Sequence, residues 1–118
     1  MNLEVHHETI GEILVIALKG QLFASSAKEL GFHLHNLVGD YKKLLFDLSQ
    51  LSQLDYDGLR ALLSFLSWAH HQGCVSKLAA LQPAPHILID ITRISQAFDC
   101  PATLEDGIQA FQISPPQQ

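Results

Sequence analysis

The chain has 118 residues, of which 47% are apolar and 16% are charged, and its formal net charge at pH 7 is −5. This length fits one domain of about 100–150 residues, and the apolar share is enough to fill a core, which excludes a disordered chain. The negative net charge and the scattered Lys and Arg residues argue against nucleic acid, whose phosphates are bound mainly by clustered basic side chains. Proteins are therefore the expected partners.

The N-terminus and the cysteines predict a cytoplasmic protein. Met1–Glu8 has neither the basic region nor the continuous apolar region of a signal peptide. No apolar stretch approaches the roughly 20 residues that span a bilayer, so we expect no membrane insertion. Cys74 and Cys100 form no C-x-x-C motif and are expected to be reduced thiols.

The first part of the chain predicts a hairpin followed by a helix. Leu3–His7 alternates apolar and polar residues, and Ile13–Leu18 is a β-branched apolar run suited to a buried strand. Ser26 and Glu29 have the spacing of a capping box and predict a helix start, and the helix is expected to end at Gly39.

The remainder predicts strands that alternate with helices. Lys43–Leu48 is a nearly unbroken apolar run, which is typical of a parallel strand covered on both faces. The elements expected after it are a helix over Gly58–His71, a strand over Val75–Leu81, a helix over His86–Ile94, a short strand over Ala97–Asp99 and a helix over Thr103–Phe111.

This order predicts an α/β fold. We expect a small mixed β-sheet, in which an opening hairpin precedes parallel strands, with about four helices packed against it. Residues 1–113 are expected to form one domain, and residues 114–118 a disordered tail.

Two acidic residues follow the strand that is predicted to end at Leu48. Asp55 and Asp57 come just before the predicted start of the next helix. Binding sites in α/β sheets gather beyond the carboxyl ends of strands, and helix N-termini attract negative charge. From the local pattern alone, Asp57 is best interpreted as an N-cap, which stabilises a helix by about 1 kcal/mol.

The same stretch resembles motifs of the STAS family. Leu44–Ser49 is similar to a family strand that reads V-L-D-L-S, and Asp55–Leu59 is similar to a helix start that reads D-S-S-G-L. Gly20–Phe23 is similar to an earlier G-x-L-D signature. The order and spacing of these motifs identify residues 1–113 as a STAS domain, the fold of bacterial anti-sigma factor antagonists and of the cytoplasmic domains of sulfate transporters.

The resemblance places Asp57 at the position of the family's phosphoacceptor serine. In the antagonists, that serine is phosphorylated by a partner kinase that is also the anti-sigma factor, and a phosphatase resets the cycle. Asp57 is not a substrate of a serine kinase, so we expect no phosphorylation there. Either Asp57 is a permanent phosphomimetic, with one negative charge where phosphoserine carries about 1.5–2, or the partner surface was rebuilt. Phe23, where the family often has an acid, favours the rebuilt surface.

The function implied is that of a non-catalytic protein-interaction module in bacterial partner-switching regulation. An anti-sigma factor, a serine kinase-like regulator or a phosphatase is the expected partner. The alternatives are a STAS subunit of a transporter or signalling assembly, and a STAS domain that binds a small ligand or nucleotide. The residues expected to bind the partner are Phe23, Asp55, Tyr56, Asp57, Gly58 and Leu59.

Enzyme chemistry is not expected. The sequence has no Gly-rich phosphate loop, no nucleophile elbow and no plausible Ser/His/Asp arrangement, so we expect neither catalysis nor a cofactor. The seven histidines lack the i, i+4 pairing of a helical metal site, which argues against a bound metal.

A second apolar line follows the core face of the helix that starts near Gly58. Ala61, Phe65 and Trp68 recur at i, i+4 and i+7. A helix that is apolar over so much of its circumference is either deeply buried or presents a contact patch. A homodimer and a complex with another protein would both fit such an interface.

Overall fold

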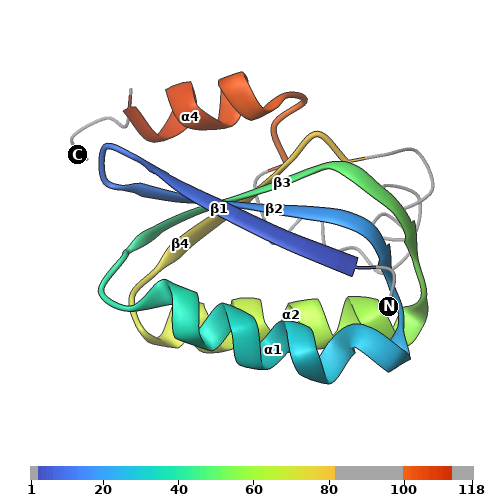
Figure 1. Ribbon diagram of the computed structural model, residues 1–118. Coiled ribbons are helices and arrows are strands. Elements are labelled where there is room, and N and C mark those ends of the chain that lie inside the picture. The colour runs from blue at the N-terminus through green and yellow to red at the C-terminus, as the bar shows by residue number, and fades with distance from the viewer. Residues whose placement is uncertain (1–2, 82–99, 113–118) are drawn as a thin grey trace.

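The computed structural model describes residues 3–81 and 100–112 (Figure 1). The elements of the described part are β1 (Leu3–Ile10), β2 (Ile13–Leu22), α1 (Ala24–Val38), β3 (Lys43–Leu54), α2 (Tyr56–His71), β4 (Val75–Ala79) and α4 (Leu104–Gln112). The helix predicted over 86–94, the strand predicted over 97–99 and the tail over 114–118 lie outside the described residues. Among the helices over 3–81 and 100–112, none is long and apolar enough to cross a membrane.

The four described strands form one mixed sheet in the order β1-β2-β3-β4. β1 runs antiparallel to β2, while β2, β3 and β4 are parallel to one another. Gly11 opens the two-residue turn between β1 and β2 with a φ of 61°, and a positive φ at this first central position is typical of a type II′ hairpin turn. The predicted hairpin followed by parallel strands is confirmed.

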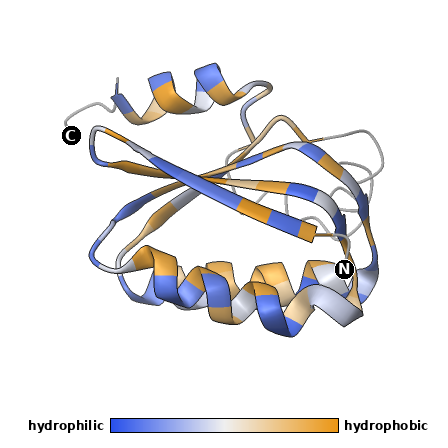
Figure 2. Cartoon of the chain, in the orientation of Figure 1, coloured by the Kyte–Doolittle hydropathy of each residue, from blue (hydrophilic) through white to orange (hydrophobic). Residues whose placement is uncertain are grey.

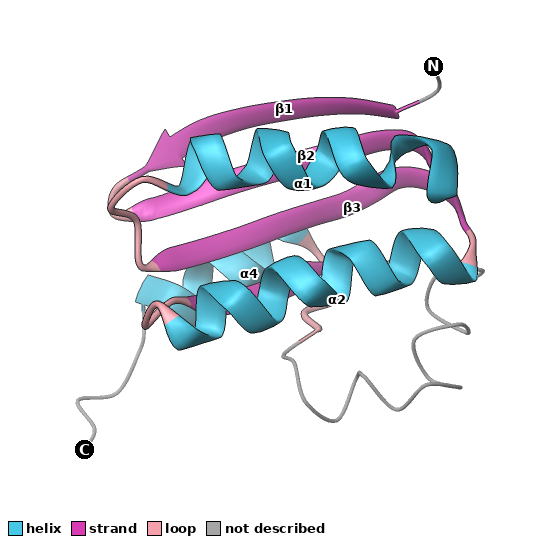
Figure 3. Cartoon of the chain, turned by 90° about the horizontal axis from the view of Figure 1, so that it is seen from below, coloured by secondary structure: helices cyan, strands magenta, loops and turns pink. Residues whose placement is uncertain are grey.

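Helices cover both faces of the sheet. α1 and α2 lie side by side on one face and α4 lies on the other (Figures 1 and 3). Because side chains alternate along a strand, Leu14 and Ile16 of β2 join the core beneath α1 and α2, while Ile13 and Val15 pack with Phe111 of α4. α1 and α2 carry their apolar residues mainly toward the sheet (Figure 2). Coverage of both faces explains why β2 and the first half of β3 are apolar almost without interruption.

The start of α1 differs from the prediction. The helix begins at Ala24, and Phe23 is its N-cap. Ser26 is 2% exposed and lies inside the first turn, where its Oγ accepts from the Phe23 N–H at 3.1 Å. The predicted capping box of Ser26 with Glu29 is therefore wrong, because Ser26 closes the turn that precedes it. At α4, Thr103 caps the start of the helix, since its Oγ1 accepts from the Asp106 N–H at 3.0 Å.

β3 is longer than predicted. It continues past Leu48 as far as Leu54, so that only Asp55 separates it from α2. The register between β2 and β3 shifts between Ala17 and Lys19 and again between Gly20 and Gln21. Such irregularities interrupt the alternation of buried and exposed residues. For this reason the sequence pattern predicts a polar loop where the structure has the last residues of β3.

Candidate functional site

The carboxylate of Asp55 joins the beginnings of α1 and α2. Asp55 is the N-cap of α2, and its Oδ1 accepts from the Gly58 N–H at 2.6 Å. Its Oδ2 accepts from the N–H of Ala24, the first residue of α1, at 3.3 Å. First-turn amides have no partner within their own helix and carry the positive end of its dipole. A single carboxylate thus satisfies amides of two helices and keeps their N-termini together at one end of the molecule (Figure 3).

Asp57 is not the N-cap that its sequence position indicates. It lies in the first turn of α2, with its side chain exposed to solvent. No hydrogen bond or ion pair joins its carboxylate to another residue of the described part. The cap prediction is wrong because the helix starts earlier, at Tyr56, and Asp55 takes the capping role. The charge of Asp57 is therefore available to a partner.

Gly58 and Leu59 lie beneath the exposed residues of the site, at the contact of α2 with β2. Both are buried, and Leu59 is only 1% exposed. A Cβ atom on Gly58 would overlap the carbonyl oxygen of Leu22 and lie 2.8 Å from its carbonyl carbon. The same oxygen accepts from the Asp55 N–H at 3.2 Å. Gly58 allows the close approach of α2 to the end of β2, and both residues lie beneath the surface of the site.

The exposed part of the site consists of Tyr56, Asp57 and the half-buried Phe23, which we call the helix-start surface. Tyr56 is 60% exposed. Phe23 is brought to the site by its chain neighbours, because Leu22 and Ala24 both bond to Asp55. An aromatic ring and a carboxylate therefore project at the point where two helices begin.

The second apolar line of α2 is divided by the packing of α1. Phe65 is 2% exposed, and its ring centroid lies 6.1 Å from that of Phe46 in the core. Phe65 therefore follows the first of the two alternatives and is part of the core, because α1 covers this flank of α2. Trp68 is 36% exposed and lies edge-on to His35 of α1, with 4.2 Å between the ring centroids. Ala61 is half-buried.

The side chains show no arrangement for metal chemistry within residues 3–81 and 100–112, where no group of three His, Cys, Asp or Glu is placed to bind an ion. Cys74 is buried, and its thiol donates to the Tyr41 carbonyl oxygen at 3.3 Å. At the helix-start surface, Tyr56 and Asp57 project from the start of α2, which is joined to α1 and β2 by the hydrogen bonds of Asp55.

Comparison with known proteins places this geometry in a family. The model of the STAS domain family matches residues 4–107. The structure of an anti-sigma factor antagonist from Mycobacterium paratuberculosis superposes with a TM-score of 0.84 at 22% identity, covering 93% of this chain and 94% of that one. A serine-to-glutamate variant of RsbS from Moorella thermoacetica gives 0.75 at 23% identity, covering 92% and 95%. A sulfate transporter family protein from Wolinella succinogenes gives 0.78 at 13% identity, covering 90% and 89%.

Proposed function

The chain belongs to the STAS domain family and resembles its anti-sigma factor antagonists, and from this premise we propose that it is a cytoplasmic, non-catalytic protein-interaction module in bacterial partner-switching regulation. The helix-start surface is the part that binds the partner. The proposal rests on the different environments of two acidic side chains. The Asp55 carboxylate accepts hydrogen bonds from the N-termini of two helices, whereas the Asp57 carboxylate is exposed and unpaired among the described residues.

The chemistry of the surface defines the partner. Tyrosine is enriched where binding energy concentrates, because its rigid ring offers a large contact area and a polar tip. The Asp57 carboxylate beside it selects a partner that presents Arg or Lys, since opposite charges steer encounter and fix register. Phe23 adds an apolar contact on the α1 side. A protein surface that combines a basic side chain with an apolar patch can contact Tyr56, Asp57 and Phe23 together.

Binding through this surface does not depend on phosphorylation. The position that carries the phosphoacceptor serine in the antagonists is Asp57 here, which bears a fixed negative charge. A fixed charge leaves the affinity unchanged when kinase or phosphatase activity changes. We therefore interpret the surface as rebuilt for constitutive binding, with Phe23 replacing an acid beside it. The amount of complex is then regulated by the concentration of the partner protein.

Affinity capture from the native host tests the proposal. Asp57→Ser is compared with the wild type and with Asp106→Ser, which changes another exposed first-turn acid, on α4 across the sheet. We expect the wild type and Asp106→Ser to retain the same regulatory protein in equal amounts, and Asp57→Ser to retain roughly tenfold less, because one charged contact is lost. Quantitative mass spectrometry of the captured proteins measures the difference.

The other outcomes separate the alternatives. If Asp57→Ser captures a kinase-type regulator that the wild type rejects, Asp57 is a permanent phosphomimetic and the surface is not rebuilt. A transporter component as the retained partner would favour the assembly subunit, which the likeness to the Wolinella succinogenes protein makes the second candidate. Equal capture by the wild type and both variants would contradict a role for Asp57.

A further inference from the structure

Among the described residues, β1 is the edge strand of the sheet on one side. Within the described residues it pairs with β2 alone, from Leu3 to Ile10 without a register shift. Natural edge strands are commonly guarded by Pro, by charged side chains and especially Lys, by a bulge or by short length, because their free amides and carbonyls template pairing with another chain. The charged side chains of β1 are two Glu, which do not prevent pairing in a register that sets them opposite His. β1 is eight residues long, contains neither Pro nor Lys, and has no bulge.

The turn determines which backbone groups face outward. Ile10 and Ile13 close the two-residue turn and form the last pair of the hairpin. A closing pair of this kind exchanges both of its hydrogen bonds, and bonded and non-bonded pairs then alternate along the ladder. The even-numbered residues of β1 therefore bond to β2. Leu3, Val5, His7 and Thr9 direct their N–H and C=O groups to the free edge.

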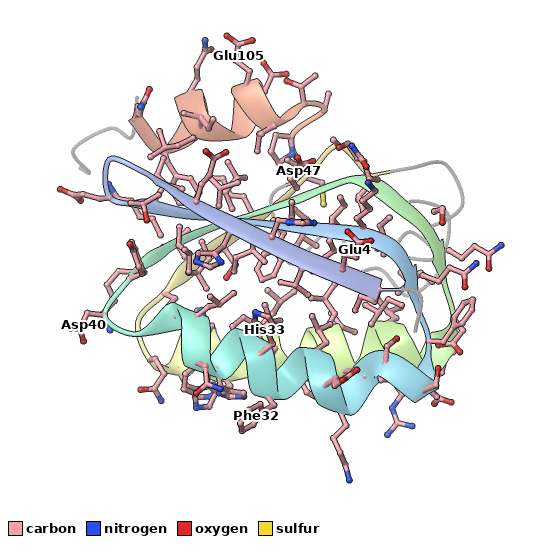
Figure 4. The ribbon with its side chains drawn as sticks, in the orientation of Figure 1. Glu4, Phe32, His33, Asp40, Asp47 and Glu105 are labelled. Atoms are coloured by element: carbon pink, nitrogen blue, oxygen red, sulfur yellow. The ribbon has the colours of Figure 1, made fainter. Side chains whose placement is uncertain are left out.

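An apolar groove runs beneath this free edge, between β1 and α1. It encloses about 530 Å³ and is lined by Leu3 and Val5 of β1 and by Leu30 and Leu37 of α1. Phe32, which is 75% exposed, lies at its outer rim. In Figure 4, His33 points from α1 toward β1, and Phe32 points away from the sheet. The groove leaves apolar surface open directly beside unpaired backbone groups.

The side chains of β1 restrict the register in which it can pair with a second antiparallel copy. Glu4 and His6 share a face of β1 and contact each other at 3.2 Å. Residues directly opposite in an antiparallel pair share a face, so the faces match only when the two-fold axis passes through a residue of β1. Centring on Glu4, His6 or Glu8 places Glu opposite Glu, whereas centring on Val5 or on His7 places His6 opposite a Glu of the other copy twice. Centring on His7 also sets the two His7 side chains opposite each other, whereas centring on Val5 sets two apolar side chains together beside the groove.

We propose that β1 pairs with β1 of a second copy of this chain, antiparallel and with the two-fold axis at Val5. The two four-stranded sheets then continue into each other. α1 lies beneath β1 and β2 (Figure 3). The two α1 helices then lie on the same face of the continuous sheet, one on each side of the two-fold axis. Leu3 and Val5 of both copies are covered together.

Sedimentation velocity of the full chain tests the dimer, which uses no residue of the helix-start surface and is independent of the proposed function. The wild type is expected to sediment as a dimer that dissociates on dilution. His6→Glu places two like-charged pairs across the axis and is expected to raise the dissociation constant at least about tenfold. His70→Glu makes the same change at an exposed position near the end of α2 and should leave the dimer intact. The double swap Glu4→Lys with His6→Glu restores opposite charges and should restore the dimer.

Cysteine scanning along β1 tests the register. Paired residues on the axis lie with Cα atoms about 5.5 Å apart, within the range of a disulfide. Val5→Cys is therefore expected to form an intermolecular disulfide faster than His7→Cys, with the native Cys74 and Cys100 setting the background seen in the wild type. Circular dichroism confirms that each variant is folded. A wild type that stays monomeric at all concentrations, or faster crosslinking through His7→Cys, overturns the proposal.

Discussion

Gly58→Ala is expected to lower the free energy of unfolding by about 3 kcal/mol, because its Cβ would overlap a backbone atom that has little freedom to move. The obstructing atom is the carbonyl oxygen of Leu22, at the end of β2. This oxygen also accepts from the Asp55 N–H, so a shift that relieves the overlap would disturb the cap of α2 as well. Urea denaturation followed by circular dichroism measures the loss.

Gly31→Ala is the matched control for this prediction. Gly31 lies inside α1, and a Cβ there would meet nothing within 4 Å. Since alanine favours the helix over glycine by about 1 kcal/mol, Gly31→Ala should stabilise the protein by roughly that amount. If Gly58→Ala proves as harmless as Gly31→Ala, α2 does not approach β2 as closely as described.

Asp55→Ala is expected to cost about 2 kcal/mol of stability, whereas Asp57→Ala should change it by less than about 0.5 kcal/mol. The first substitution removes the acceptor of two helix N-termini, and the second removes an exposed carboxylate with no partner among the described residues. The pair is matched, because the same side chain is deleted two positions apart. Thermal and urea denaturation of both variants give the comparison.

Asp55→Asn refines this test. The asparagine oxygen can still accept from Gly58, and asparagine is a good N-cap, but its amide nitrogen has no lone pair to accept from Ala24. Its cost should therefore lie between those of Asp55→Ala and the wild type. Equal losses for Asp55→Ala and Asp57→Ala would mean that the capping role is shared and that Asp57 is not free for a partner.

The strands and helices of the described part were predictable because periodicity reports which faces are covered. The run of apolar residues in Ile13–Leu18 reflects coverage by helices on both sides of the sheet. Periodicity failed for Phe65, since the apolar stripe of one helix does not reveal whether a neighbouring helix lies beside it. α1 does lie there, and Phe65 is part of the core.

The candidate site was located by sequence, but the roles within it were not. Two acids spaced two apart are equally suited to cap a helix, and the choice depends on where β3 ends. β3 continues beyond its apolar run, to Leu54. The sequence pattern does not reveal these last residues, because the register shifts interrupt the alternation of buried and exposed side chains. The bond from Asp55 to Ala24 joins residues 31 positions apart, and no local pattern signals it. The exposure of Asp57 follows from these two facts.

The partner's footprint on the isotope-labelled domain is the most direct measurement of where binding occurs. The protein captured from the native host is titrated into the labelled chain, and the backbone amide resonances are followed by NMR. We expect the largest shifts at Phe23, Tyr56 and Asp57, with α4 unchanged and with Asp57→Ser weakening the whole pattern. Shifts confined to α4 or to β1, with the start of α2 unaffected, would contradict binding through the helix-start surface.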